Sequence, residues 1–256
     1  MALGGDALAK AVFFLSTTET RSQLYRLLQY GSKFTKWTLI QRWQLDRDTA
    51  NTTSNTIQLK QSAAVAAPSS ELRIQDCEDW RKRIVASLGR AELVFGDARR
   101  LFRFLQFLDM ADLYRNVREP LRSVRVLRRL RILCFFFFYL TENYVVLHTR
   151  VLGVSPRDPF MQRMRRGCNG FWVLSILLAF PLDRMMQRGS MLSTLKKLLD
   201  LPVAFVGLSG LRVNDGLFGA LGLASAQLGV YNRWVDVMAK FRQQHLKRLG
   251  ATTDIA

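Results

Sequence analysis

Residues 94–108 read VFGDARRLFRFLQFL and follow the period of an α-helix, with apolar and basic side chains on opposite sides. An apolar face opposite a basic face is typical of a helix at the boundary between acyl chains and phosphates, although a core-facing helix of a soluble bundle is also amphipathic. We interpret the apolar side as a membrane-inserting face, formed by Val94, Phe95, Ala98, Leu101, Phe102, Leu105 and Leu108. The residues predicted to contact lipid headgroups are Arg99, Arg100 and Arg103.

The net charge of the chain narrows the class of partner that it can bind. Among its 256 residues, Lys and Arg outnumber Asp and Glu by 38 to 20, which gives a formal net charge of +18 at pH 7. This charge predicts a polyanionic partner, either nucleic acid or an anionic phospholipid membrane. The cysteines, Cys77, Cys134 and Cys168, are odd in number and lack a disulfide spacing, which indicates a reducing compartment or burial in a membrane.

Apolar runs in the second half of the chain favour a membrane over nucleic acid. The run at 132–140 contains four consecutive phenylalanines, and a helix that is apolar on all sides is either deeply buried or surrounded by lipid. The run at 170–182 is shorter than the roughly 20 residues that a membrane span needs. The stretch 201–231 is long enough but is interrupted by polar residues, so it predicts a helical hairpin that turns at 213–216. The fold class that we predict is therefore all-α, a membrane-associated protein with amphipathic helices and a C-terminal glycine-rich hydrophobic hairpin.

Changes in composition divide the chain into segments. From Asp48 the helical period is lost and Thr, Asn, Ser and Ala predominate, which predicts a flexible linker until the period resumes near Ile74. After Trp234 the chain becomes polar and basic, as expected of a tail on the cytosolic side of a membrane. The predicted segments are an N-terminal helical unit (1–47), a flexible polar linker (48–73), a basic amphipathic helical region (74–131), a membrane-embedded helical region (132–234) and a basic cytosolic tail (235–256).

Small residues recur at helical spacing near the C-terminus. Each glycine costs a helix in water roughly 1 kcal/mol relative to alanine. In lipid, by contrast, small residues let two helices pack closely, and the apolar residues between them argue against a glycine-rich loop. We therefore predict a helix-packing and self-association surface, and with it a homo-oligomer, from Gly216, Gly219, Gly222, Ser225 and Gly229.

The sequence offers little for catalysis or metal binding. His148 and His245 are isolated from other ligand residues, and the chain has no phosphate-binding loop, dinucleotide fingerprint or hydrolase motif. We therefore predict no enzyme activity, no cofactor and no metal. Glu142 lies inside an apolar run, where a carboxylate can mark a transport path, but we expect it to pair with an arginine or to line a helix interface. The arginines of 121–131 could contact nucleic-acid phosphates, but the adjacent Phe135–Phe138 suits lipid better, so we expect no nucleic-acid partner.

Several stretches together resemble the peroxin-eleven family of membrane-elongation proteins. Thr20–Phe34 is similar to the N-terminal signature of that family, and Ala98–Phe104 to its basic amphipathic helix. Tyr139–Asn143 resembles a central motif, and Asp200–Ala204, followed by the glycines and Trp234, resembles the C-terminal membrane segment. The residues that carry the N-terminal signature are Tyr25, Arg26, Leu28, Tyr30 and Gly31.

The resemblance implies a protein of the peroxisomal membrane, or of the related glycosome. Such a protein would insert amphipathic helices to curve and elongate the organelle membrane, self-associate, and promote proliferation and fission. It implies both termini in the cytosol and, as partners, anionic phospholipid, a second copy and the organelle fission machinery. An alternative within the family is an oligomeric channel for small metabolites.

Overall fold

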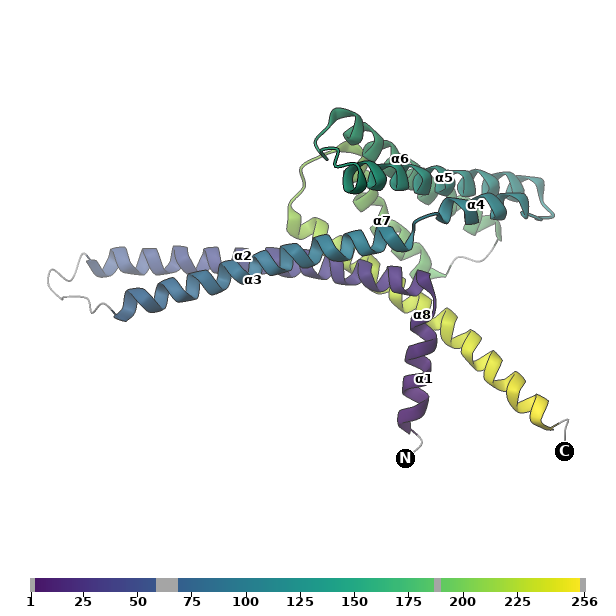
Figure 1. The fold of residues 1–256 in the computed structure, drawn as a ribbon, viewed down its shortest axis with the longest axis horizontal. Coiled ribbons are helices and arrows are strands. Elements are labelled where there is room, and N and C mark those ends of the chain that lie inside the picture. Colours follow the sequence, from purple (N-terminus) through teal and green to yellow (C-terminus); the bar gives the residue numbers. More distant parts are fainter. Residues whose placement is uncertain (1–2, 59–68, 187–189, 254–256) are drawn as a thin grey trace.

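The computed structural model describes residues 3–58, 69–186 and 190–253, and within these ranges the chain is helical with no strand. This confirms the predicted all-α class. Figure 1 shows the arrangement of the helices. In chain order the elements are α1 (Leu3–Leu15), α2 (Thr18–Gln58), α3 (Ser69–Phe102), α4 (Gln106–Arg115), α5 (Arg122–Val146), the π-helix η1 (Leu147–Val151), α6 (Pro159–Met186), α7 (Met191–Ser209) and α8 (Asp215–Thr253).

A long pair of helices, α2 and α3, forms one layer of the molecule, and α8 packs against α2 (Figure 1). Aromatic side chains join α2 to α3, where the ring of Tyr25 stacks on Phe95 and Phe102. The helix α1 precedes α2 and adds to this layer. It contacts α8 through the edge-to-face pair Phe14 and Trp234. These contacts bury part of the apolar surface that each helix carries.

A second layer lies over the first and consists of α4, α5 and α6, with α7 between it and α8 (Figure 1). The consecutive phenylalanines of α5 supply much of this packing, because Phe137 stacks on Phe171 of α6 and Phe138 contacts Trp172. The start of α1 and the end of α8 lie on the same side of the molecule (Figure 1).

Helix boundaries differ from the prediction at the N-terminal unit. The predicted boundary at residue 47 lies inside α2, which continues to Gln58, and α3 already begins at Ser69. Residues 59–68 of the predicted linker lie outside the described residues. Thr, Asn and Ser are poor formers of helix interiors, but extending an existing helix costs far less than nucleating one, so α2 continues through them. The predicted boundary at residue 235 likewise lies inside α8.

The helix predicted over 94–108 is broken. The helix α3 ends at Phe102, and α4 begins at Gln106 after a turn that includes Leu105, whose φ of 63° is left-handed. Backbone hydrogen bonds of the i to i+3 kind close this turn, among them Phe104 N–H to the Leu101 carbonyl at 3.0 Å. Tertiary packing overrides the amphipathic period here, because α4 turns away from α3 to pack along α5.

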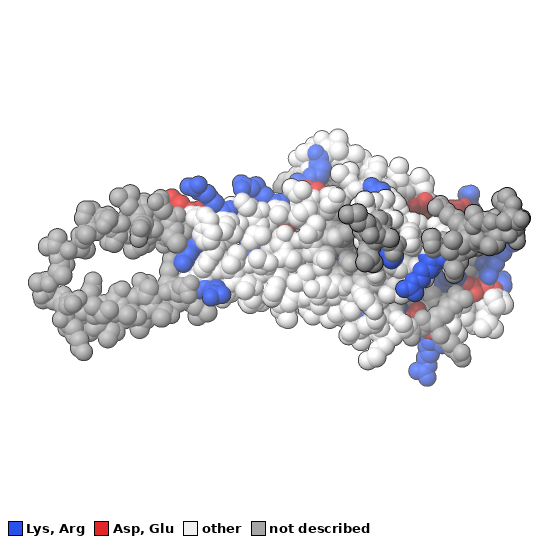
Figure 2. All heavy atoms as spheres, turned by 90° about the horizontal axis from the view of Figure 1, so that it is seen from below, with Lys and Arg blue, Asp and Glu red and all other residues white. Residues whose placement is uncertain are grey.

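Among the described residues, one helix is long and apolar enough to cross a membrane by length and composition, namely Arg122–Val151, which comprises α5 and η1. In its most apolar window of 18 residues, 22% are buried within the chain. Several of its large apolar side chains are exposed, among them Phe137, Leu140 and Leu147. Charged side chains are also unevenly distributed: few lie over the middle of the face shown in Figure 2, and Lys and Arg gather toward its ends and one edge.

Candidate functional site

The outward side of the segment from α3 to α4 is apolar and exposed. Leu101 is 68% exposed, Val94 62%, Leu108 55% and Leu105 47%. A group of exposed large apolar side chains often marks a site that binds a protein or a membrane, so this surface is a candidate binding face. With two exposed neighbours, these residues are called the outer apolar set below, and its members are Leu93, Val94, Leu101, Phe104, Leu105 and Leu108.

The remaining residues of the predicted membrane-inserting face point elsewhere. Phe95 and Phe102 pack against Tyr25 of α2, with ring centroids 6.0 Å and 5.4 Å apart, and Ala98 is partly buried. The predicted face is therefore divided, with one half turned outward and the other turned to α2. The division arises because the apolar stripe of α3 is wide enough to cover a neighbouring helix and still leave an outer edge uncovered.

Of the arginines predicted to contact headgroups, Arg99 and Arg103 are held inside the protein, whereas the side chain of Arg100 is 41% exposed. Arg103 pairs with Glu142 of α5 at 2.5 Å, and both side chains are 13% exposed. Arg99 donates to the Gln29 side chain of α2 at 3.3 Å, and Arg100 pairs with Asp97 at 2.9 Å. For Arg99 and Arg103 the predicted orientation is therefore wrong, because the basic side of α3 faces α2 and α5. The pairing expected for Glu142 is confirmed.

Other exposed arginines follow the outer apolar set along the chain. Arg115 ends α4, Arg118 lies in the connection that follows, and Arg122 begins α5, and all have exposed side chains. The sequence reasoning passed over Arg115 and Arg118, because neither belongs to an amphipathic period. Both residues lie between the apolar helix α4 and the basic first turns of α5, and this position could have identified them.

A buried charge cluster joins the N-terminal signature to the C-terminal segment. Asp200 of α7 accepts hydrogen bonds from Arg26 of α2, from Ser225 of α8 and, at 2.7 Å, from Lys196. Burial disfavours the ionised carboxyl, but the charges of Arg26 and Lys196 and their hydrogen bonds outweigh it and hold the pKa of Asp200 at about 2. The guanidinium of Arg26 also lies 5.7 Å from the ring of Trp172 of α6. The cluster therefore links four helices.

Most of the N-terminal signature lies against α8 or α3. Tyr30 is buried and contacts Phe218, Gly31 faces Leu223, and Tyr25 packs on α3. Leu28 is 42% exposed, so this residue of the signature is not buried between α2 and its neighbours. The signature thus serves the packing of α2 between its neighbours.

The small residues of α8 also face α2 of the same chain. A Cβ atom added at Gly216 would overlap the ring of Trp37, and one at Gly222 would overlap Tyr30. At Gly219 it would lie 3.2 Å from the Cα of Phe34. In this fold the predicted self-association surface is therefore covered by the chain itself, because the same close approach that suits two copies suits α2 and α8. Ser225 is fully buried in the Asp200 cluster, and a Cβ at Gly229 would lie 2.7 Å from the Gln23 side chain.

The stretches that carry the family resemblance therefore meet in space, Arg26 with Asp200 and Arg103 with Glu142. A family model described as Peroxisomal biogenesis factor 11 (PEX11) matches residues 74–185 and 181–234. The chain belongs to the PEX11 family. The match contains the amphipathic, central and C-terminal stretches of the resemblance, whereas the signature at Thr20–Phe34 lies outside the matched residues. Comparisons with curated proteins and with solved structures gave no match.

Membership of the PEX11 family establishes a role in peroxisomal biogenesis and a place at the peroxisomal membrane. The family is one of biogenesis factors. Among the described residues, no group of three or more His, Cys, Asp or Glu side chains is arranged to hold a metal ion.

Proposed function

We propose that this PEX11 protein inserts the outer apolar set into one leaflet of the peroxisomal membrane, and thereby curves and elongates it before fission. The observation that carries the proposal is the exposure of these side chains on α3 and α4, at 47% to 68% for each of them. A wedge in one leaflet expands that leaflet alone, and the bilayer relieves the difference in area by bending. The family assignment favours this role over the alternative of an oligomeric channel.

Apolar burial provides most of the binding free energy in this proposal. Full burial of one Leu or Phe side chain is worth about 1.5–3 kcal/mol. Partial burial of the outer apolar set would therefore sum to roughly 5–10 kcal/mol before the cost of ordering is subtracted. The broken helix suits this role, because α3 and α4 present apolar side chains at two angles and so widen the inserted surface.

Exposed arginines supply the preference for anionic lipid. Arg115, Arg118 and Arg122 replace Arg99 and Arg103 as the proposed headgroup contacts, because their side chains are exposed between the end of α4 and the start of α5. Each basic residue near an anionic surface contributes about 1 kcal/mol, which salt screens.

Two further parts of the proposal concern topology and assembly. The start of α1 and the end of α8 lie on one side of the molecule, which supports the proposal that both termini face the cytosol (Figure 1). Self-association and contact with the fission machinery would use surfaces other than the glycine side of α8, since α2 covers that side.

The experiment is a comparison of full-length variants on anionic vesicles. The double variant Leu101→Glu, Leu105→Glu should float with vesicles at least about tenfold less well than the parent and should form no tubules in electron micrographs. Leu8→Glu is the matched control, because Leu8 of α1 is 67% exposed, as Leu101 is 68% exposed. Equal tubulation by the parent and the double variant would falsify the proposal.

A further inference from the structure

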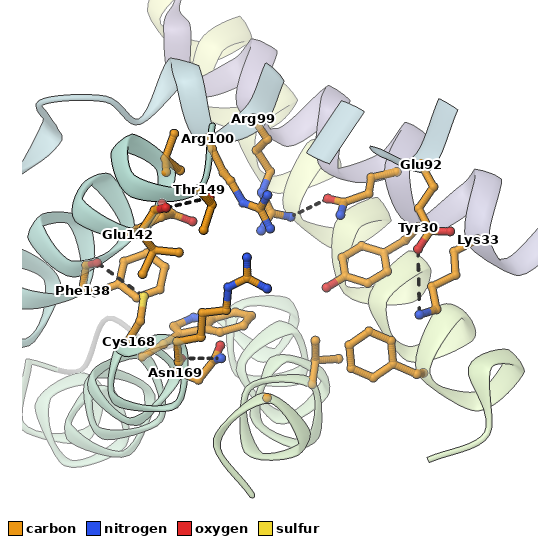
Figure 3. Close-up of a pocket in the computed structure, with 18 residues that line it drawn as sticks. Tyr30, Lys33, Glu92, Arg99, Arg100, Phe138, Glu142, Thr149, Cys168 and Asn169 are labelled. Carbon is orange, nitrogen blue, oxygen red and sulfur yellow. Dashed lines mark hydrogen bonds and ion pairs between the residues drawn. The ribbon is translucent and has the colours of Figure 1, made fainter. Parts of the chain in front are cut away.

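A cavity lies where the two layers meet, away from the outer apolar set. Its volume is about 300 Å³, and α2, α3, α5, α6, α7 and α8 all contribute to its wall. Figure 3 shows Arg99 and Arg100 entering from α3, with Glu142 and Cys168 on one side and Tyr30 on the other. A volume of this size is at the lower end of the range for pockets that hold small organic ligands.

The charge of the cavity wall is unbalanced. Lys33, Arg99, Arg100 and Arg165 line it, against two carboxylates. Both carboxylates are already engaged, Glu142 by Arg103 at 2.5 Å and Glu92 by Lys36 at 2.7 Å. Arg100 pairs with Asp97, and Lys33 with Asp215 at 3.0 Å. The wall therefore carries positive charge that its own acidic groups do not neutralise.

Two guanidiniums lack a carboxylate partner within the described part of the chain. Arg99 has only the Gln29 side-chain oxygen at 3.3 Å, and Arg165 forms no ion pair there. Burial, with the charge of Arg103, lowers the pKa of Arg99 to about 9. Burial, with the charges of Arg100 and Arg150, lowers the pKa of Arg165 as well. Both lowered pKa values indicate that the charged guanidiniums are destabilised by their surroundings. A bound anion would stabilise these charged forms.

The rest of the wall adds a hydrogen-bond donor and an apolar side. The ring of Tyr30 is buried and its hydroxyl points into the cavity, where it has no hydrogen bond to another described group (Figure 3). Trp172, Val203 and Phe218 form apolar parts of the wall. Guanidinium groups match the oxygens of a phosphate in a forked geometry, and the apolar wall suits a carbon chain beside it.

We infer that this cavity binds a phosphate group, with Arg99 and Arg165 as the main charge contacts and Tyr30 as a hydroxyl donor. The phosphate belongs either to a soluble phosphate compound or to the headgroup of an anionic phospholipid that enters from the membrane. The site is separate from the outer apolar set, so membrane insertion and phosphate binding can fail independently.

The test is calorimetric titration of the full-length protein in a neutral detergent with two probes, inorganic phosphate and dihexanoyl phosphatidic acid. Arg99→Gln and Arg165→Gln should each weaken binding by about tenfold, and Tyr30→Phe by a few-fold, since it removes one hydrogen bond and keeps the ring. Arg166→Gln is the matched control, because Arg166 follows Arg165 on α6 but is exposed, and it should bind as the parent does.

The outcomes separate the sources of the phosphate. Binding of both probes supports a site for a soluble phosphate, and binding of phosphatidic acid alone supports a lipid headgroup, provided that Arg99→Gln and Arg165→Gln weaken it. Without a probe, Arg99→Gln should melt at the same temperature as the parent or higher, since it removes an uncompensated charge. Absence of binding at millimolar concentrations, or equal binding by the parent and both arginine variants, overturns the inference.

Discussion

At the scale of single residues, Asp200 is a buried carboxylate that joins α2, α7 and α8 through Arg26, Lys196 and Ser225. Its side chain is 6% exposed, and it neutralises two cations, Arg26 at 8% exposure and Lys196 at 24%. A buried cation without its partner is costly, because neither water nor protein then compensates its charge. The stability of the packing between α2, α7 and α8 therefore depends on this one carboxylate.

Asp200→Asn should lower the free energy of unfolding by about 3–5 kcal/mol, the range for breaking a buried ion pair from one side. Thermal unfolding in detergent measures this. The control is Asp79→Asn, since Asp79 pairs with Lys82 on the surface of α3 and such pairs contribute little. A loss of equal size in both variants would contradict the role of the buried cluster.

The same residue predicts a pH dependence. The pKa of Asp200 in the folded protein, about 2, lies below its ordinary value of 3.8, so the unfolded chain takes up a proton first as pH falls. The stabilisation by the cluster is thus fully present above about pH 4 and is lost toward pH 2. The difference in melting temperature between the parent and Asp200→Asn should narrow over that interval and stay constant from pH 5 to pH 7.

At the scale of elements, the contact of α8 with α2 depends on the absence of side chains. At Gly222 the ring of Tyr30 fills the space that a Cβ would need, whereas a Cβ at Gly89 of α3 would meet nothing within 4 Å. Both glycines lie inside helices, where alanine is intrinsically preferred by about 1 kcal/mol. Their different surroundings therefore predict opposite effects of one and the same substitution.

Gly222→Ala should destabilise the protein by about 1–3 kcal/mol, because the added methyl group forces Tyr30 to move in a packed interface. Gly89→Ala should stabilise it by about 0.5–1 kcal/mol through helix preference. Unfolding measurements on both variants check this pair of signs. Loss of oligomers on cross-linking of Gly222→Ala, with unchanged stability, would instead indicate that α8 packs against a second copy.

At the scale of the whole molecule, the proposed function gives the exposed apolar residues and the exposed arginines different roles on a membrane. The outer apolar set would provide the larger part of the affinity, which salt does not screen. Arg115, Arg118 and Arg122 would provide the part that salt does screen and that selects anionic lipid.

The triple variant Arg115→Gln, Arg118→Gln, Arg122→Gln should bind anionic vesicles about tenfold to a hundredfold less tightly than the parent, and should lose most of the salt dependence of binding. Its binding to neutral vesicles should stay the same. Titration of vesicles at low and high salt measures all of these. Arg83→Gln serves as the control, as its side chain is exposed on α3 and lies further along the helix from the outer apolar set and from α4.

Local patterns predicted much of this protein because they depend on neighbours along the chain. The helical class, the helix around residues 216–231 and the pairing of Glu142 with an arginine all follow from spacing and composition, whereas the break within 94–108 does not. The continuation of α2 to Gln58 does not, because the tendency of a helix to extend through poor helix formers is set by what precedes them. The partner of Asp200 also could not be predicted, since Arg26 lies far from it in the chain.

By itself the sequence determined that the chain is helical, which residues share a side of each helix, and that it resembles the PEX11 family. Only the tertiary structure decided which side faces which neighbour. The apolar stripe of α3 lies partly on Tyr25 and partly in the open, Arg99 and Arg103 face inward, and the glycines of α8 receive α2. The physical reason is that helical periodicity relates residues to one another around an axis, while the rotation of that axis in the fold depends on contacts between distant segments.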